Sequence, residues 1–86
     1  MIFDFQENKC VFEVLKILVE KEKSKYGEMF KKTKVSHVTL QTVLRKLAEK
    51  EFISKHNIGH QKVDYTITNK GKKLLNILFQ LREISA

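Results

Sequence analysis

The chain has 86 residues, of which 42% are hydrophobic and 31% charged, and its 17 Lys and Arg outnumber 10 Asp and Glu to give a formal net charge of +7. This balance excludes a disordered chain and fits one small globular domain over residues 1–86. The excess of positive charge favours a polyanionic partner, although surface lysines also serve simply to solvate a protein.

Neither a membrane nor a secretory route is expected. No apolar run approaches the length of a membrane span, and no basic segment followed by an apolar core marks a signal peptide. We therefore expect a cytoplasmic protein.

Cysteine and histidine usage indicates no metal centre and no cofactor. Cys10 is the only cysteine, which excludes an intrachain disulfide and a cysteine-based metal cluster. It is expected to be a small buried hydrophobe, the alternative being an interchain disulfide across a dimer axis. His56 and His60 are four residues apart but lie across a turn, so a metal site is not expected.

Catalytic motifs are missing from the sequence. It contains no Gly-rich phosphate loop, no HExxH motif and no nucleophile elbow, and its three histidines and one cysteine fall on separate predicted elements. We expect that the chain is not an enzyme.

The first predicted helix covers residues 7–23. Its apolar positions cover more than half of the helix circumference at about 100° per residue. One face should meet the core of the domain, and a second subunit is the expected cover for the remainder. These positions are Cys10, Val11, Phe12, Val14, Leu15, Ile17, Leu18 and Val19.

Two further helices follow. Ser24 is expected to cap a short helix over residues 26–32, with Tyr26, Met29 and Phe30 turned inward. After a turn at residues 33–35, Ser36 is a good N-cap for a third helix. Its apolar residues recur at i, i+3, i+4 and i+7, which predicts a one-sided helix; they are Leu40, Val43, Leu44 and Leu47.

A β-hairpin is predicted next. Residues 52–54 form its first strand, and residues 62–67 alternate in the manner of a second strand. Asn57 and Gly59 suit the positive φ that a hairpin tip often needs. The tip is polar and basic.

Thr68 is expected to cap a last helix over residues 69–84. Its apolar arc is again too wide for one contact. We therefore expect residues 7–23 and 69–84 to form a homodimer interface. The predicted interface residues are Val11, Val14, Ile17, Leu74, Ile77, Leu78, Leu81 and Ile84.

The order of helix, hairpin and helix resembles the winged helix-turn-helix transcription regulators, especially small archaeal ones and the group that includes the MarR and PadR types. The best-matched pieces are residues 38–47, 50–53 and 65–75, the last of which carries a T-x-K-G pattern at Thr68, Lys70 and Gly71. The resemblance implies an α+β fold with a three-helix core, a two-stranded wing and a C-terminal helix. Glu51 departs from the family, which usually has Gly where this helix ends. No extra ligand-binding domain is present, so no small-molecule ligand is expected.

An α-helix fits the major groove of B-DNA, where base edges are distinguishable. The resemblance matches Gln41, Thr42 and Arg45 to the base-reading face of the family, and Arg45 combines charge with a bidentate fork. On the third helix, the expected DNA contacts are Ser36, His37, Val38, Gln41, Thr42, Arg45 and Lys46. On the turn and the wing, they are Lys32, Lys34, Lys55, His56, Asn57, His60, Gln61 and Lys62.

These expectations describe a homodimeric, sequence-specific regulator of transcription that binds double-stranded DNA. Two other roles use the same features. A sequence-tolerant architectural DNA-binding protein needs the charge but little base readout. A winged helix can also act as a protein–protein interaction module, with the outer face of the third helix on a partner.

Overall fold

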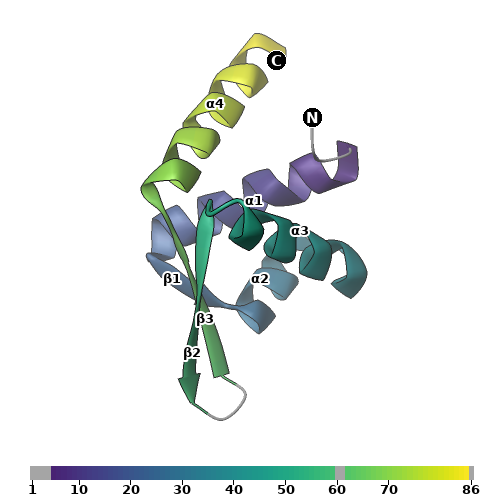
Figure 1. The fold of residues 1–86 in the computed structure, drawn as a ribbon. Helices are drawn as coiled ribbons and strands as arrows, with labels where there is room; N and C mark the ends of the chain where they lie inside the picture. Colours follow the sequence, from purple (N-terminus) through teal and green to yellow (C-terminus); the bar gives the residue numbers. More distant parts are fainter. Residues whose placement is uncertain (1–4, 60–61, 86) are drawn as a thin grey trace.

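The computed structural model describes residues 5–59 and 62–85, and within these ranges it describes the side chains of all but residues 5–8, 82, 84 and 85. Four helices and three strands make up the fold (Figure 1). In chain order they are α1 (Phe5–Lys21), β1 (Lys23–Lys25), α2 (Tyr26–Thr33), α3 (His37–Glu49), β2 (Ile53–Gly59), β3 (Lys62–Ile67) and α4 (Asn69–Ser85). No helix in the described part of the chain is both long and apolar enough to cross a membrane.

Helix α1 is the centre of the core, because α2, α3, α4 and the sheet all pack against it. Its wide apolar arc is therefore covered within one chain except at Val19, which is exposed. Val11, Val14 and Ile17 are buried, which corrects the prediction that they belong to a dimer interface. Cys10 is also fully buried, which agrees with the expectation of a small buried hydrophobe rather than a surface thiol at a dimer axis.

The sheet has three antiparallel strands in the order β1-β3-β2, one more than the sequence predicted. The additional strand is β1, in which Ser24 faces Tyr65 of β3 and is buried. Ser24 was expected to cap α2, but Lys25 holds that position. The three residues of β1 are a serine between two lysines, so no alternation of apolar and polar residues predicts a strand here. The strand forms through its pairing with β3, which exists only in the folded chain.

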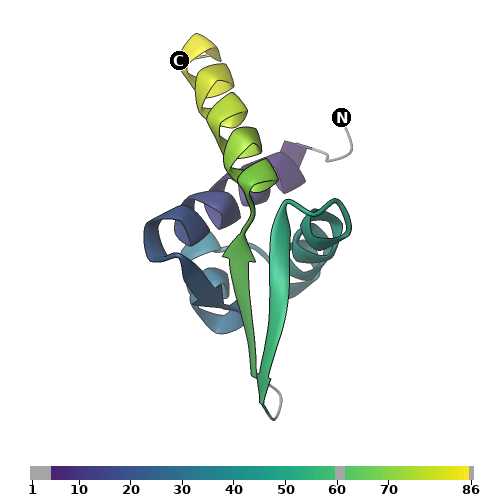
Figure 2. The same ribbon diagram turned by 60° about the vertical axis from the view of Figure 1, so that its left-hand side comes forward.

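Strands β2 and β3 form the predicted wing, which projects from the helices (Figure 2). The register pairs Ile53 with Ile67 and shifts by one residue between Asn57 and Gly59, as in a β-bulge. Gly59 has a φ of 143°, as expected. Asn57 does not have a positive φ, contrary to prediction, because it pairs with Val63 within the ladder.

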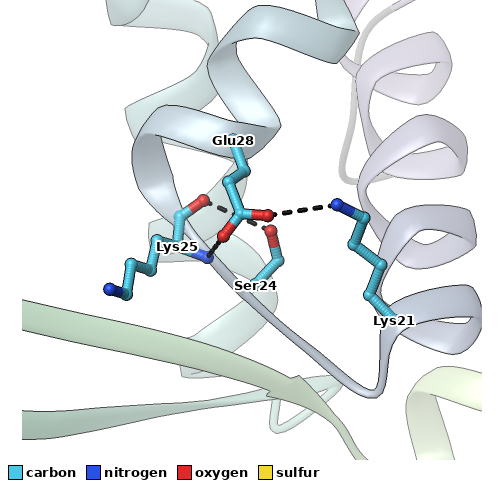
Figure 3. Close-up of polar contacts among 4 residues, drawn as sticks. All are labelled: Lys21, Ser24, Lys25 and Glu28. Carbon is cyan, nitrogen blue, oxygen red and sulfur yellow. Dashed lines mark hydrogen bonds and ion pairs between the residues drawn. The ribbon is translucent and has the colours of Figure 1, made fainter.

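The junction between α1 and α2 depends on Glu28 (Figure 3). Its carboxylate accepts hydrogen bonds from Lys21 Nζ at 3.2 Å and from the Lys25 backbone N–H at 3.5 Å. The hydrogen bond from Lys21, followed by that from Lys25, lowers the pKa of Glu28, while the same carboxylate raises the pKa of Lys21. Glu28 thus supplies half of a capping box and connects the two helices.

Helix α3 begins and ends with defined caps. The side chain of Ser36 accepts a hydrogen bond from the Thr39 backbone N–H at 3.1 Å, which confirms the predicted N-cap. At the other end, the N–H groups of Glu51 and Phe52 donate to the carbonyls of Ala48 and Leu47 at 3.1 and 2.9 Å. This is a Schellman motif, and it places Glu51 in the left-handed region with a φ of 63°. The residue that departs from the family pattern therefore occupies the position that favours glycine.

Helix α4 starts against the end of α3. Thr68 caps α4, as predicted, by accepting from the Gly71 N–H at 3.0 Å, and its hydroxyl hydrogen points to the carbonyls of Glu51 and Phe52 at 2.7 and 2.9 Å. Lys70 Nζ donates to the Lys50 carbonyl at 2.8 Å. Beyond this joint α4 packs against α1, and its C-terminal end extends away from the other elements (Figures 1 and 2).

Helix α4 carries three of the six large hydrophobic residues that are exposed in the described part of the chain. Leu75 is buried, Leu74 and Leu78 are half-buried, and the ring of Phe79 meets that of Phe12 at 5.0 Å. Ile77 and Leu81 retain 53% and 47% of their accessible surface. They are four residues apart and therefore neighbours on the helix.

Glu51→Gly should raise the free energy of unfolding by about 1 kcal/mol, because glycine adopts the left-handed conformation without a Cβ penalty. Lys50→Gly is the matched control, since Lys50 has a φ of −89°. It should lower the free energy of unfolding by about 0.5 kcal/mol through greater unfolded-state entropy. Urea denaturation measures both, and equal destabilisation would contradict a strained Glu51.

Glu28→Gln should lower the unfolding midpoint at pH 7 and leave it unchanged in acid. Because the pKa of Glu28 is lowered in the folded state, its contribution is present above the unfolded-state pKa and is lost as pH falls through the folded-state pKa. Thermal unfolding between pH 3 and 7 measures the difference. Glu20→Gln, at an exposed carboxylate with no ion pair among the described residues, should show no such pH-dependent loss.

Candidate nucleic-acid interface

Four exposed polar side chains follow one ridge of α3 at a spacing of four residues. They are His37, Gln41, Arg45 and Glu49, here called the polar ridge. The opposite side of the helix is buried as predicted, by Leu40, Val43, Leu44 and Leu47. Because residues i and i+4 are neighbours on a helix surface, the ridge forms one continuous strip along α3.

An open cleft of about 690 Å³ separates this ridge from the wing and is here called the groove. It brings together Gln41 and Arg45 of α3 with Lys55 and Lys62 of the hairpin, all of which were predicted as DNA contacts. The remaining lining comes from Leu44, Ala48 and Glu49 of α3, from Val63 and Tyr65 of β3, and from Lys25, Tyr26 and Gly27 where β1 meets α2.

Sequence analysis missed the contribution of Lys25, Tyr26 and Gly27 to the groove. They precede the first residue of α3 by ten to twelve residues, and the pairing of β1 with β3 brings them to the cleft. In the register of β1 and β3, Lys25 pairs with Asp64. No pattern in the sequence predicts this pairing, so the sequence did not indicate that these residues line the groove.

The charge of the groove is mainly positive. Lys25, Arg45, Lys55 and Lys62 supply four cations, against the single carboxylate of Glu49. A concave surface with one predominant sign of charge concentrates its field on an anionic partner. The charge of the groove therefore suits a polyanionic partner.

Two tyrosines add neutral polar groups to the groove. Burial raises the pKa of both Tyr26 and Tyr65. Their phenols therefore stay protonated near neutral pH, where a phenol can both donate and accept a hydrogen bond.

Arg45 and Glu49 form an ion pair at 3.4 Å, with side chains that remain 63% and 60% exposed. Such an exposed pair contributes little to stability. The guanidinium can therefore turn to another acceptor at small cost, and the five N–H donors of its fork suit a guanine edge or a phosphate.

His37 is exposed but held. Its ring lies on Phe30 with centroids 3.7 Å apart and planes 9° from parallel. Its Nδ1 is 2.8 Å from the hydroxyl of Tyr26. The first side chain of the polar ridge is thus fixed by two aromatic residues of α2.

The other predicted residues of α3 differ in what they offer. Ser36 uses its hydroxyl within the chain, since it accepts from the Thr39 N–H and donates to Thr39 Oγ1 at 3.0 Å. Val38 is 73% exposed and so offers an apolar contact. Thr42 and Lys46 are half-buried at the flank of the helix.

The predicted residues of the turn and wing are exposed where the structure describes them. Lys32 and Lys34 lie at the end of α2, beside the start of α3. His56 contacts Thr66 Oγ1 through Nε2 at 3.0 Å, and Asn57 is exposed. The predictions for His60 and Gln61 lie outside the described residues, as does that for the side chain of Ile84. Within the described part of the chain, no three His, Cys, Asp or Glu residues gather as metal ligands.

Solved structures with this fold are numerous. The chain superposes on smu.1704 from Streptococcus mutans UA159 with a TM-score of 0.83 at 23% identity, over 99% of this chain and 86% of that one. For Sso10a-2, a DNA-binding protein from Sulfolobus solfataricus, the TM-score is 0.80 at 19% identity, over 91% and 79% of the two chains. A MarR-family transcriptional regulator from Silicibacter pomeroyi gives a TM-score of 0.76 at 18% identity, over 84% of this chain and 49% of that one.

No curated protein sequence matches the chain. A family model described as winged helix-turn-helix matches residues 6–86. This match confirms the predicted fold and agrees with the expectation that the chain is not an enzyme. The four helices and the three-stranded antiparallel sheet have the winged-helix arrangement, and the chain belongs to the winged helix-turn-helix family.

Proposed function

We propose that this chain is a sequence-specific regulator of transcription that binds double-stranded DNA as a homodimer. The observation that carries the proposal is the groove, where the polar ridge of α3 and the basic wing face one concave, predominantly positive cleft. A protein with this role acts inside the cell, at its DNA.

In this proposal α3 enters the major groove and reads base edges through its ridge. Gln41 pairs with adenine, and Arg45 leaves Glu49 to pair with guanine. Lys55 and Lys62 contact phosphates on the flank, where they add affinity but no sequence information. Occupancy of a promoter then blocks or recruits polymerase.

The similar structures support a role in DNA binding. Sso10a-2 is described as a DNA-binding protein, and the protein from Silicibacter pomeroyi as a transcriptional regulator. A third similar protein, BpsR from Bordetella bronchiseptica, has its DNA binding regulated by 6-hydroxynicotinic acid. The shared feature is the winged-helix fold that presents α3 and the wing together.

The homodimer is proposed to form through α4. Ile77 and Leu81 form an exposed apolar strip, with half-buried Leu74 beside it, on a helix that extends beyond the body of the domain. Burying such a strip against its copy removes apolar surface from water. A two-fold dimer of this kind would present two α3 helices to half-sites about one DNA turn apart.

Selection from a random duplex pool at two salt concentrations tests the function. An enriched inverted repeat with half-sites about one turn apart is the expected result. Retention without enrichment would favour the architectural alternative, and no retention at either salt would replace DNA with a protein partner.

Arg45→Ala should weaken binding to the enriched duplex by about 1–3 kcal/mol while changing binding to random duplex much less, because its fork reads a base. Lys62→Ala is the matched control, since it removes a groove cation that contacts phosphate. It should weaken both duplexes alike and flatten the salt dependence. Fluorescence anisotropy titrations measure all four affinities, and equal losses for Arg45→Ala would exclude base reading by this residue.

Ile77→Glu should convert the dimer to monomers, because it would bury a carboxylate in an apolar interface. Asn76→Glu adds the same charge on the polar side of α4 and should leave the dimer intact. Sedimentation velocity distinguishes the two species. An Ile77→Glu protein that remains dimeric would remove α4 from the interface.

A further inference from the structure

We propose that Tyr26 and Phe30 are positioning residues for DNA binding, which hold His37 so that its Nε2–H donates a hydrogen bond to a DNA phosphate. This inference rests on the proposed function and adds a preorganised contact at the start of the polar ridge. Sequence analysis placed Tyr26 and Phe30 only in the core.

The first support is the restraint of an exposed side chain. His37 stacks on Phe30 at 3.7 Å, and its plane is 12° from that of Tyr26, whose centroid is 5.7 Å away. Tyr26 and Phe30 are themselves 6° from parallel. An exposed imidazole ordinarily samples several rotamers, and ordering it on binding costs affinity. Here that order exists before any partner arrives.

The second support is the hydrogen bond at 2.8 Å between Tyr26 and His37 Nδ1. Because a phenol O–H is more acidic than the N–H of a neutral imidazole, we assign Tyr26 as the donor to Nδ1. A neutral imidazole that accepts at Nδ1 carries its hydrogen on Nε2. Tyr26 therefore selects the tautomer in which the other ring nitrogen is a donor.

The third support is the place of His37 relative to the groove. It stands one helical turn before Gln41, which lines the groove, and Tyr26 lines the same cleft. The adjacent Val38 is 73% exposed, so this end of α3 is open to a partner. A phosphate beside the base pair read by Gln41 is the nearest anionic group that such a donor would meet.

A double-mutant cycle tests this coupling on the duplex enriched from the random pool. Tyr26→Phe removes only the hydroxyl and should weaken binding about fivefold, the effect of one hydrogen bond. In a His37→Ala background, Tyr26→Phe should have no further effect. Thr33→Val is the matched control, because it removes from the same helix a buried hydroxyl that has no hydrogen-bond partner among the described residues and does not line the groove, and it should leave the affinity unchanged. Phe30→Leu, which keeps apolar bulk but removes the flat platform, should weaken binding only when His37 is present.

Nitrogen-15 NMR of the imidazole supplies a readout that a merely structural role would not change. The wild type should show hydrogen on Nε2, and Tyr26→Phe should show a mixture of tautomers. Hydrogen on Nδ1 in the wild type, or an equal loss for Tyr26→Phe with and without His37, would overturn the inference. If the wild type retained no duplex, this contact and the proposed function would both fail, whereas DNA binding with zero coupling would overturn the contact alone.

Discussion

The corner between α3, β2 and α4 is the contact on which the rest of the structure depends. The Phe52 carbonyl accepts from both the N–H and the hydroxyl of Thr68, while the hydroxyl also reaches the Glu51 carbonyl. A Cβ at Gly71 would overlap the Phe52 carbonyl oxygen, so only glycine allows α4 to approach this closely. The T-x-K-G pattern is thus a joint that sets where α4 leaves the domain.

That joint connects α3, the proposed DNA-reading helix, with α4, the proposed dimerisation helix. The carbonyls it satisfies belong to the residues that follow the last turn of α3, and the helix it starts carries the exposed apolar strip. Lys70 adds to it by donating to the Lys50 carbonyl and lying over the ring of Phe52 at 4.8 Å. A dimer formed through α4 would therefore hold two α3 helices at a separation decided by this corner.

The groove differs from the helix surface that the sequence suggests. A helix alone offers a strip of polar side chains, and each of these is ordinarily only solvated. The structure faces that strip with lysines of the wing and with the β1–α2 junction, so that cations from three parts of the chain share one concave surface. It also restrains the first residue of the strip, because His37 is held by Tyr26 and Phe30.

Local sequence determined the parts of the fold that depend on local interactions. The caps at Ser36 and Thr68 and the one-sided burial of Leu40, Val43, Leu44 and Leu47 follow from periodicity and hydrogen bonding within a few residues. Tertiary structure alone decided the rest. Strand β1 exists because β3 pairs with it, and Val11, Val14 and Ile17 are covered because α1 is enclosed on several sides. A sequence pattern shows that an apolar arc needs cover, but which element provides the cover depends on contacts between residues far apart in the chain.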